Sequence, residues 1–380
     1  MINVKKLISV TLAVIMIFSL TVPVFARVEG KSQYPIIRLN GNGNSIFDET
    51  GAQVYGFDYD TSNLVDDVIE VCMPELIDGV ITGDYSKYYE KLYNKISDLY
   101  GNAKLDENGE PMGGADISKS DRQDLINRAS RDTAAGKGFY DLGDYMFWYD
   151  WRLDPMKLAD ELNDYINAIL ETTGKDKVSP FGRCIGGVPI IAYLGKYGSG
   201  KIDTGCFDAV VANGGEMIGD TFTGNLNLNS DALMRGANGY YSDTVKGFMG
   251  DDDMIFNFVM STLKTLNALG FTEAELQGFM DTVFAAVGEG FISSFCRASF
   301  ATWPSYWALV KADGFEQAKN VIFGAEGSEL RQKYAGLIGK LDNYHDVVSS
   351  RIPEILTATR ESGTKVCITS NYGYQLYPYV

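Results

Sequence analysis

One seven-residue stretch, Gly182-Arg-Cys-Ile-Gly-Gly-Val188, constrains the fold more than any other part of the chain. It follows the apolar run KVSPF and precedes PIIAYLGKYG, which is a helix-like run. A Gly-x-Cys-x-Gly core between a strand and a helix is typical of a sharp turn that exposes one side chain, because side chains at the glycine positions would collide with the neighbouring strand and helix. The pattern predicts such a turn with Cys184 at its tip. A buried, inert cysteine in a tight strand-to-helix turn is the alternative.

The order of strand-like and helix-like segments around this turn predicts the fold class. Short apolar strands alternate with helices, which implies right-handed crossovers and a mainly parallel sheet flanked by helices. We therefore expect an α/β fold. The expected strands are residues 35–39, 52–60, 145–149, 177–181, 207–215 and 364–370, and the expected helices are 61–100, 118–136, 156–173, 188–198 and 351–363.

Between residues 216 and 345 the strand pattern disappears, and apolar segments rich in Phe, Met and Trp take its place. We interpret this region as a helical cap inserted into the α/β domain. The domain itself would comprise residues 33–215 and 346–380, and it is expected to be incomplete at the C-terminus because a full sheet of this kind needs further strands.

The first 26 residues have the organisation of a secretory signal peptide. Lys5 and Lys6 precede a long apolar run, and Val24-Phe25-Ala26 forms a cleavage site of the small-x-small type. The sequence therefore predicts an exported, secreted protein with no stable membrane anchor after cleavage. An uncleaved anchor is the alternative, since the apolar run is long for a signal peptide.

Charge and cysteine content exclude several classes of partner. The chain has 33 Lys and Arg against 50 Asp and Glu, a net charge of −17, which argues against binding to nucleic acids or anionic membranes. Its five cysteines are widely spaced, and no Cys/His cluster suggests zinc. We expect no metal and no cofactor.

Three motifs together resemble the α/β-hydrolase fold, most closely its branch of lipases and lecithin–cholesterol acyltransferase-like enzymes. The elbow at Gly182 to Gly186, followed by Gly187, carries cysteine where that branch has serine. The run Tyr149-Asp-Trp-Arg152 matches a strand end of that branch, and Leu39-Asn-Gly-Asn-Gly43 matches its first-strand loop, with Asn-Gly in place of Pro-Gly. The resemblance covers roughly residues 33–60, 139–215 and 364–370. Dienelactone hydrolases and polyhydroxyalkanoate synthases also carry cysteine in this turn.

This arrangement predicts acyl transfer through a thioester on Cys184. The thiol would attack an ester, and the N-terminus of the following helix would favour its thiolate. The backbone N–H of Ile185 would supply half of an oxyanion hole, and the backbone at Asn42 and Gly43 the other half. The expected function is a secreted acyl hydrolase or acyltransferase of the esterase or lipase type, with a small-molecule or lipid ester as substrate.

The general base is the missing part of this prediction. His345 is the one histidine in the chain, and it precedes the last expected strand, whereas the fold places its histidine after that strand. Glu216 and Asp220 are candidate acids, although ordinary loop carboxylates would look the same. We expect the base and its acid to lie beyond Val380. The alternative is a non-catalytic, exported protein of the same fold that binds a lipid or a surface partner.

Overall fold

The computed structural model describes residues 34–41, 45–55, 81–117, 122–134, 144–213 and 296–370, with a few single residues in 72–79 and 290–294. The proposed signal peptide and most of the proposed cap lie outside these residues. Among the described residues, no helix has the length and apolarity needed to cross a lipid bilayer.

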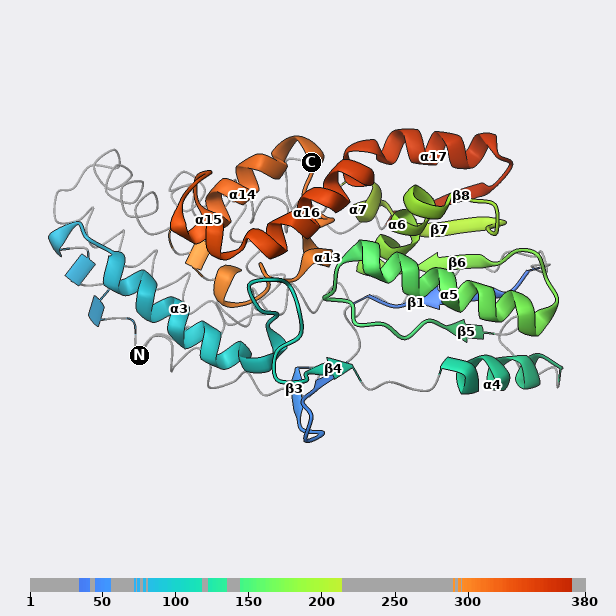
Figure 1. Ribbon diagram of the computed structural model, residues 1–380, viewed down its shortest axis with the longest axis horizontal. Coiled ribbons are helices and arrows are strands. Elements are labelled where there is room, and N and C mark those ends of the chain that lie inside the picture. The colour runs from blue at the N-terminus through green and yellow to red at the C-terminus, as the bar shows by residue number, and fades with distance from the viewer. Residues whose placement is uncertain are drawn as a thin grey trace, which may run out of the picture.

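A five-stranded parallel sheet is the larger of the two sheets in the described chain (Figure 1). Its order is β5-β1-β6-β7-β8, and every neighbouring pair runs parallel. The strands are β1 (Ile36–Leu39), β5 (Asp144–Met146), β6 (Ser179–Gly182), β7 (Thr204–Asp208) and β8 (Lys365–Thr369). Together with the flanking helices, this sheet confirms the expected α/β architecture.

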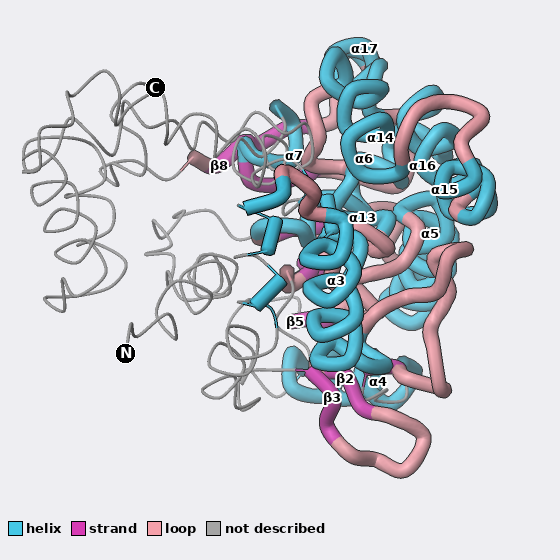
Figure 2. Tube along the Cα trace, turned by 90° about the vertical axis from the view of Figure 1, so that its left-hand side faces the viewer, coloured by secondary structure: helices cyan, strands magenta, loops and turns pink. Residues whose placement is uncertain are grey.

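A small antiparallel sheet of order β3-β2-β4 stands apart from the main one. Its strands are β2 (Ile46–Phe47), β3 (Gln53–Tyr55) and β4 (Asp116–Ile117). It lies by the C-terminal end of α3 (Ser86–Tyr100), as the rotated view in Figure 2 also shows. The strand expected at residues 52–60 therefore belongs, over Gln53–Tyr55, to this second sheet.

Two long helices that the sequence predicted cover the main sheet. Helix α5 (Pro155–Thr173) begins at Asp154, whose side chain accepts a hydrogen bond from the Met156 N–H at 2.9 Å, and ends at Gly174 with φ +66°. Helix α6 (Gly187–Tyr197) is buried from Gly187 to Leu194. The two helices lie side by side, and Lys196 of α6 forms an ion pair of 2.6 Å with Asp160 of α5.

The remaining helices surround this core. The described residues between 296 and 361 form helices and turns, with α17 running along β8 (Figure 1). The helices are α4 (Arg122–Ala134), α7 (Ala209–Asn213), α13 (Pro304–Trp307), α14 (Phe315–Phe323), α15 (Glu329–Lys333), α16 (Ala335–Val347) and α17 (Ile352–Glu361), with short 3₁₀ turns at Gly101–Ala103, Cys184–Gly186, Ala312–Gly314 and Ser349–Arg351.

Two expected strands were partly wrong. The sequence predicts a strand over 145–149, whereas β5 spans Asp144–Met146. It also predicts a strand over 207–215, but β7 ends at Asp208 and Ala209–Asn213 form the helix α7. A short apolar run has no periodicity that separates a buried strand from a buried helix. Here the chain leaves the sheet after Asp208, and Phe207 and Val211 on either side of this point both pack against Gly187 of α6.

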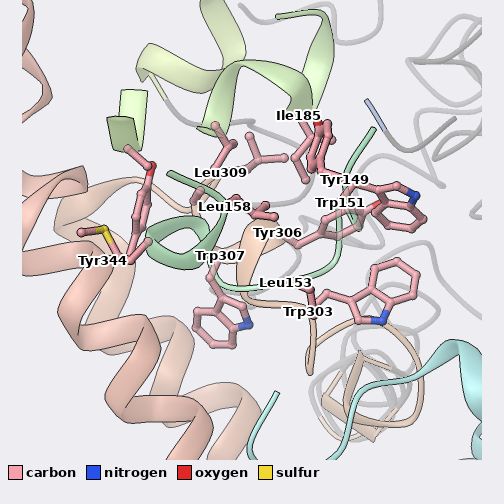
Figure 3. Packing of buried hydrophobic residues seen from close by; sticks show 14 of the residues in the cluster. Tyr149, Trp151, Leu153, Leu158, Ile185, Trp303, Tyr306, Trp307, Leu309 and Tyr344 are labelled. Atoms are coloured by element: carbon pink, nitrogen blue, oxygen red, sulfur yellow. The ribbon is translucent and has the colours of Figure 1, made fainter. Parts of the chain in front are cut away.

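An aromatic cluster joins the end of β5 to residues 300–307. Trp151 and Trp303 meet edge to face, with ring centroids 5.0 Å apart, and Tyr306 packs on both (Figure 3). Edge-to-face pairs are favourable because the positive edge of one ring meets the negative face of the other. The cluster therefore fixes residues 300–307 to the core of the α/β domain.

Candidate functional site

Cys184 lies at the tip of a strained turn between β6 and α6. Its φ angle is +53°, and it is the one non-glycine residue with positive φ in the part of the chain that the structure describes. The left-handed region costs an L-residue roughly 1–2 kcal/mol, so such residues are held there by their surroundings. The sequence predicted a sharp turn at this position, and the backbone has that form.

The three glycines of the turn are required by close backbone approaches. A Cβ atom on Gly182 would lie 2.5 Å from the Gly186 carbonyl oxygen, and one on Gly186 would lie 2.2 Å from the carbonyl oxygen of Leu39. A Cβ on Gly187 would lie 2.8 Å from the Cβ of Phe207. Each distance is too short for a real contact, so the turn can pack between β1 and β7 only with glycine at these three positions.

The loop after β1 lies directly against the cysteine. A Cβ on Gly41 would stand 3.1 Å from the Cys184 Cβ and 3.6 Å from its Sγ. The Arg183 N–H donates to the Leu39 carbonyl oxygen at 3.0 Å, which holds the end of β1 beside the turn. Asn42 and Gly43, the expected oxyanion residues of this loop, lie outside the described residues.

The order of the strands explains why the Gly41 loop and Cys184 lie next to each other. From β1 the chain moves to β5 at one edge, and from β5 it crosses back to β6 on the other side of β1. In open parallel sheets such a reversal leaves a crevice at the carboxyl ends of the two strands, where ligands bind. The Gly41 loop and Cys184 lie at the carboxyl ends of β1 and β6, which are the two strands at this reversal.

Asp208, at the end of β7, is a site residue that sequence reasoning missed. Its Oδ2 accepts a hydrogen bond from the backbone N–H of Cys184 at 2.6 Å. Its Oδ1 accepts a short hydrogen bond from the hydroxyl of Thr369, at the end of β8. One carboxylate thus connects the turn after β6 to β7 and β8. The signal in the sequence that could have identified Asp208 as a site residue is its position at the carboxyl end of a strand.

Tyr149, in the segment after β5, also lies next to Cys184 and the loop after β1. Its hydroxyl donates to the Asn40 carbonyl oxygen at 2.6 Å and so fixes the start of the β1 loop. Burial, and secondly the proximity of Cys184, raise the pKa of Tyr149, which keeps the phenol protonated. Its ring also stacks on Phe147 with centroids 5.2 Å apart.

The Cys184 thiol is protonated at neutral pH. Its pKa is raised to about 11, mainly because the half-buried sulfur is shielded from water. A hydrogen bond from the Ile185 N–H lowers the pKa, the Asp208 carboxylate raises it, and the Arg183 charge lowers it. At pH 7 a thiol with this pKa is ionised in about one molecule in 10⁴. Nucleophilic chemistry at Cys184 therefore requires a base.

His345 is engaged elsewhere. In α16 its ring stacks on Phe315 with centroids 4.2 Å apart, its Nε2 lies 3.3 Å from the Ala312 carbonyl oxygen, and its Nδ1 lies 3.2 Å from Asp346. These contacts engage both ring nitrogens and the ring face of His345. Glu216 and Asp220, the candidate acids, lie outside the described residues.

Asp150 and Arg152 have a structural role. Both are buried, and the Arg152 guanidinium donates to both carboxylate oxygens of Asp150, at 3.0 and 2.6 Å. It also donates to the carbonyl oxygens of Ala103 and Ala115 at 2.9 and 3.1 Å. A buried ion pair needs such additional hydrogen bonds to offset its desolvation. The pair therefore fixes residues 103–115 to the segment after β5.

Comparison with protein-family models, with curated proteins and with solved structures gave no match. Among the described residues, no group of three or more His, Cys, Asp and Glu side chains could hold a metal ion.

Proposed function

We propose that this protein is an exported acyl hydrolase or acyltransferase of the α/β-hydrolase type that acts through a thioester on Cys184. One observation carries the proposal: Cys184 stands at φ +53° on a strand-to-helix turn whose glycines admit no side chain. This is the geometry of a nucleophile elbow, which exposes the reacting atom above the carboxyl edge of a parallel sheet.

The surroundings of Cys184 support acyl chemistry. The Ile185 N–H is already directed to the sulfur, close to where the oxygen of a bound ester carbonyl would develop negative charge. The loop after β1 lies against the cysteine at Gly41, and backbone N–H groups at Asn42 and Gly43 would complete the oxyanion hole. Two backbone segments therefore support the proposal.

The proposed reaction has two steps. A base removes the Cys184 proton, the thiolate attacks the ester carbonyl carbon, and the tetrahedral intermediate expels the alcohol, which takes up a proton. The acyl group now forms a thioester with Sγ. Water or a second alcohol then attacks this carbonyl and restores the thiol, releasing an acid or a new ester.

Turnover of p-nitrophenyl butyrate by the full chain and by a Cys184→Ala variant tests the proposal. We expect p-nitrophenol release to fall to background in Cys184→Ala and to be retained in a Cys367→Ala control, which removes an exposed thiol instead. A butyryl group that is found on the Cys184 peptide by mass spectrometry, and is released by neutral hydroxylamine, would identify the thioester. Equal rates for the wild-type and Cys184→Ala chains would refute the proposal.

The raised pKa of Cys184 and the remote contacts of His345 favour a second candidate, a non-catalytic protein of this fold that binds a lipid or a surface partner. Labelling of the reduced protein with iodoacetamide at pH 7 distinguishes the two. An activated Cys184 reacts faster than the exposed Cys367, whereas an inert thiol reacts more slowly than Cys367.

A further inference from the structure

Cys206 of β7 and Cys367 of β8 are directly paired neighbours in the sheet. The register aligns Cys206 with Cys367, between the pairs Gly205–Val366 and Phe207–Ile368. Since successive side chains in a strand alternate between the two faces, directly paired residues of adjacent strands project from the same face. The two thiols therefore lie side by side.

The distance between these cysteines suits a covalent bond. Neighbouring strands lie about 4.8 Å apart, within the Cα separation of about 4.4–6.8 Å that disulfides span. The side chains already contact each other, because the Cys206 and Cys367 thiols share a hydrogen bond. A bond can thus form with a change of side-chain rotamer and little movement of the backbone.

We propose that Cys206 and Cys367 form a disulfide bond that fastens β8 to β7. Access supports this assignment, since Cys367 is exposed and Cys206 is half-buried. Cys72 and Cys296 are buried, and Cys184 belongs to the strained turn. The bond would form whether or not Cys184 is catalytic, so it is independent of the proposed function.

The chemistry needs a disulfide oxidant, for which glutathione disulfide serves. The exposed Cys367 thiolate attacks one sulfur of glutathione disulfide, forming a mixed disulfide and releasing one glutathione thiolate. The Cys206 thiolate then attacks the Cys367 sulfur and releases the second glutathione. Two protein thiols lose two electrons and two protons, and one glutathione disulfide becomes two glutathione thiols. Export, as the N-terminal sequence predicts, would bring the pair to a compartment where such bonds persist.

The bond would lie next to the contacts of the candidate site. Two residues further along the same strands, Asp208 pairs with Thr369 in the register, and the Thr369 hydroxyl donates to the Asp208 carboxylate. That carboxylate also accepts a hydrogen bond from the backbone N–H of Cys184. In the described sheet β8 is an edge strand that pairs with β7 alone. A cross-link between Cys206 and Cys367 would therefore help to maintain the hydrogen bond from the Thr369 hydroxyl to the Asp208 carboxylate.

Thiol mapping of the full chain tests the proposal. The protein is equilibrated with glutathione disulfide at pH 8.5, quenched with acid, alkylated and digested, and its peptides are identified by mass spectrometry. We expect one linked peptide that joins Cys206 to Cys367, with Cys72, Cys184 and Cys296 alkylated. A glutathione adduct on Cys367 without a link to Cys206, or a link from either cysteine to a different one, would overturn the proposal.

A Cys367→Ser variant and urea unfolding provide a second measurement. The oxidised wild-type chain is expected to unfold at higher urea than the reduced chain, because the cross-link restricts the unfolded ensemble over a long loop. The variant should unfold at the same urea concentration with and without glutathione disulfide. An oxidised wild-type midpoint at or below the reduced one would contradict a bond that fits the native register.

Discussion

Replacing Gly186 with alanine tests the packing of the elbow most directly. The added Cβ would lie 2.2 Å from the Leu39 carbonyl oxygen, 2.8 Å from the Leu39 carbonyl carbon and 3.0 Å from the Asn40 carbonyl oxygen. These are backbone atoms, which cannot rotate away as a side chain can. The Arg183 N–H also binds the Leu39 oxygen at 3.0 Å, so the end of β1 is held in place.

The cost follows from the size of this overlap. Extra carbon atoms in a well-packed core cost about 1–3 kcal/mol where side chains can adjust. Relief here requires β1 and β6 to move apart by about an ångström, so we expect the upper end of that range. A loss of about 3 kcal/mol lowers the ratio of folded to unfolded molecules roughly 140-fold.

Urea unfolding followed by circular dichroism measures this loss, and Gly200→Ala is the matched control. No atom lies within 4 Å of a Cβ at Gly200. We therefore expect Gly200→Ala to stay within about 0.5 kcal/mol of the wild-type chain or to exceed its stability slightly. If Gly186→Ala unfolds within about 0.5 kcal/mol of Gly200→Ala, the close approach of β1 to the turn is refuted.

Three further predictions concern Cys184 and the buried ion pair. Because Cys184 has φ +53°, the Cys184→Gly variant should be more stable than Cys184→Ala by about 1 kcal/mol in urea unfolding. At the exposed helical position Lys157, the alanine variant should instead be more stable than the glycine variant by about 1 kcal/mol, and the same order of stability at both positions would contradict the argument. Because the pKa of Cys184 is raised to about 11, its alkylation rate should rise about tenfold per pH unit from pH 7 to 10, as the thiolate fraction grows, and a plateau below pH 9 would contradict the burial argument. Asp150→Asn removes the charge opposite the buried Arg152 guanidinium and should lower the free energy of unfolding by about 3–5 kcal/mol, against about 0–1 kcal/mol for Asp160→Asn in an exposed pair. Similar losses for the two variants would contradict the argument that burial makes the Asp150–Arg152 pair more important for stability.

Local patterns predicted those parts of the fold that local interactions determine. Helix α5 has a regular apolar face, Pro155 at its first turn and Gly174 just beyond its end, so both its existence and its bounds followed from the sequence. The elbow followed from the glycine spacing of one short segment, although the atoms that exclude side chains at Gly186 and Gly187 belong to Leu39 and Phe207, which are distant in the chain. In both cases the pattern of one segment was sufficient to predict the element.

Features that depend on distant contacts were not predictable. Asp208 meets Cys184 only because β6 and β7 pair in one register, which pairs Gly182 with Phe207. Likewise β2 pairs with β4, whose residues follow it by about seventy positions in the chain, and nothing in either short segment marks the other as its partner. The aromatic segment 145–149 was expected as a strand, but β5 spans Asp144–Met146.

The identity of residue 184 is itself an argument for function. At φ +53° glycine avoids the left-handed cost of roughly 1–2 kcal/mol that cysteine carries, so the stability of this turn alone would favour glycine. Burial also holds the thiol neutral, and Asp208 binds the Cys184 backbone N–H, a group that every residue except proline has. The backbone conformation and the hydrogen bond to Asp208 therefore do not require a sulfur, which itself accepts a hydrogen bond from the Ile185 N–H and packs against the hydrophobic core. Strain of this kind concentrates at functional sites, and here it falls on a cysteine at the carboxyl edge of the sheet. The sulfur itself is thus the group whose reactivity should be measured first.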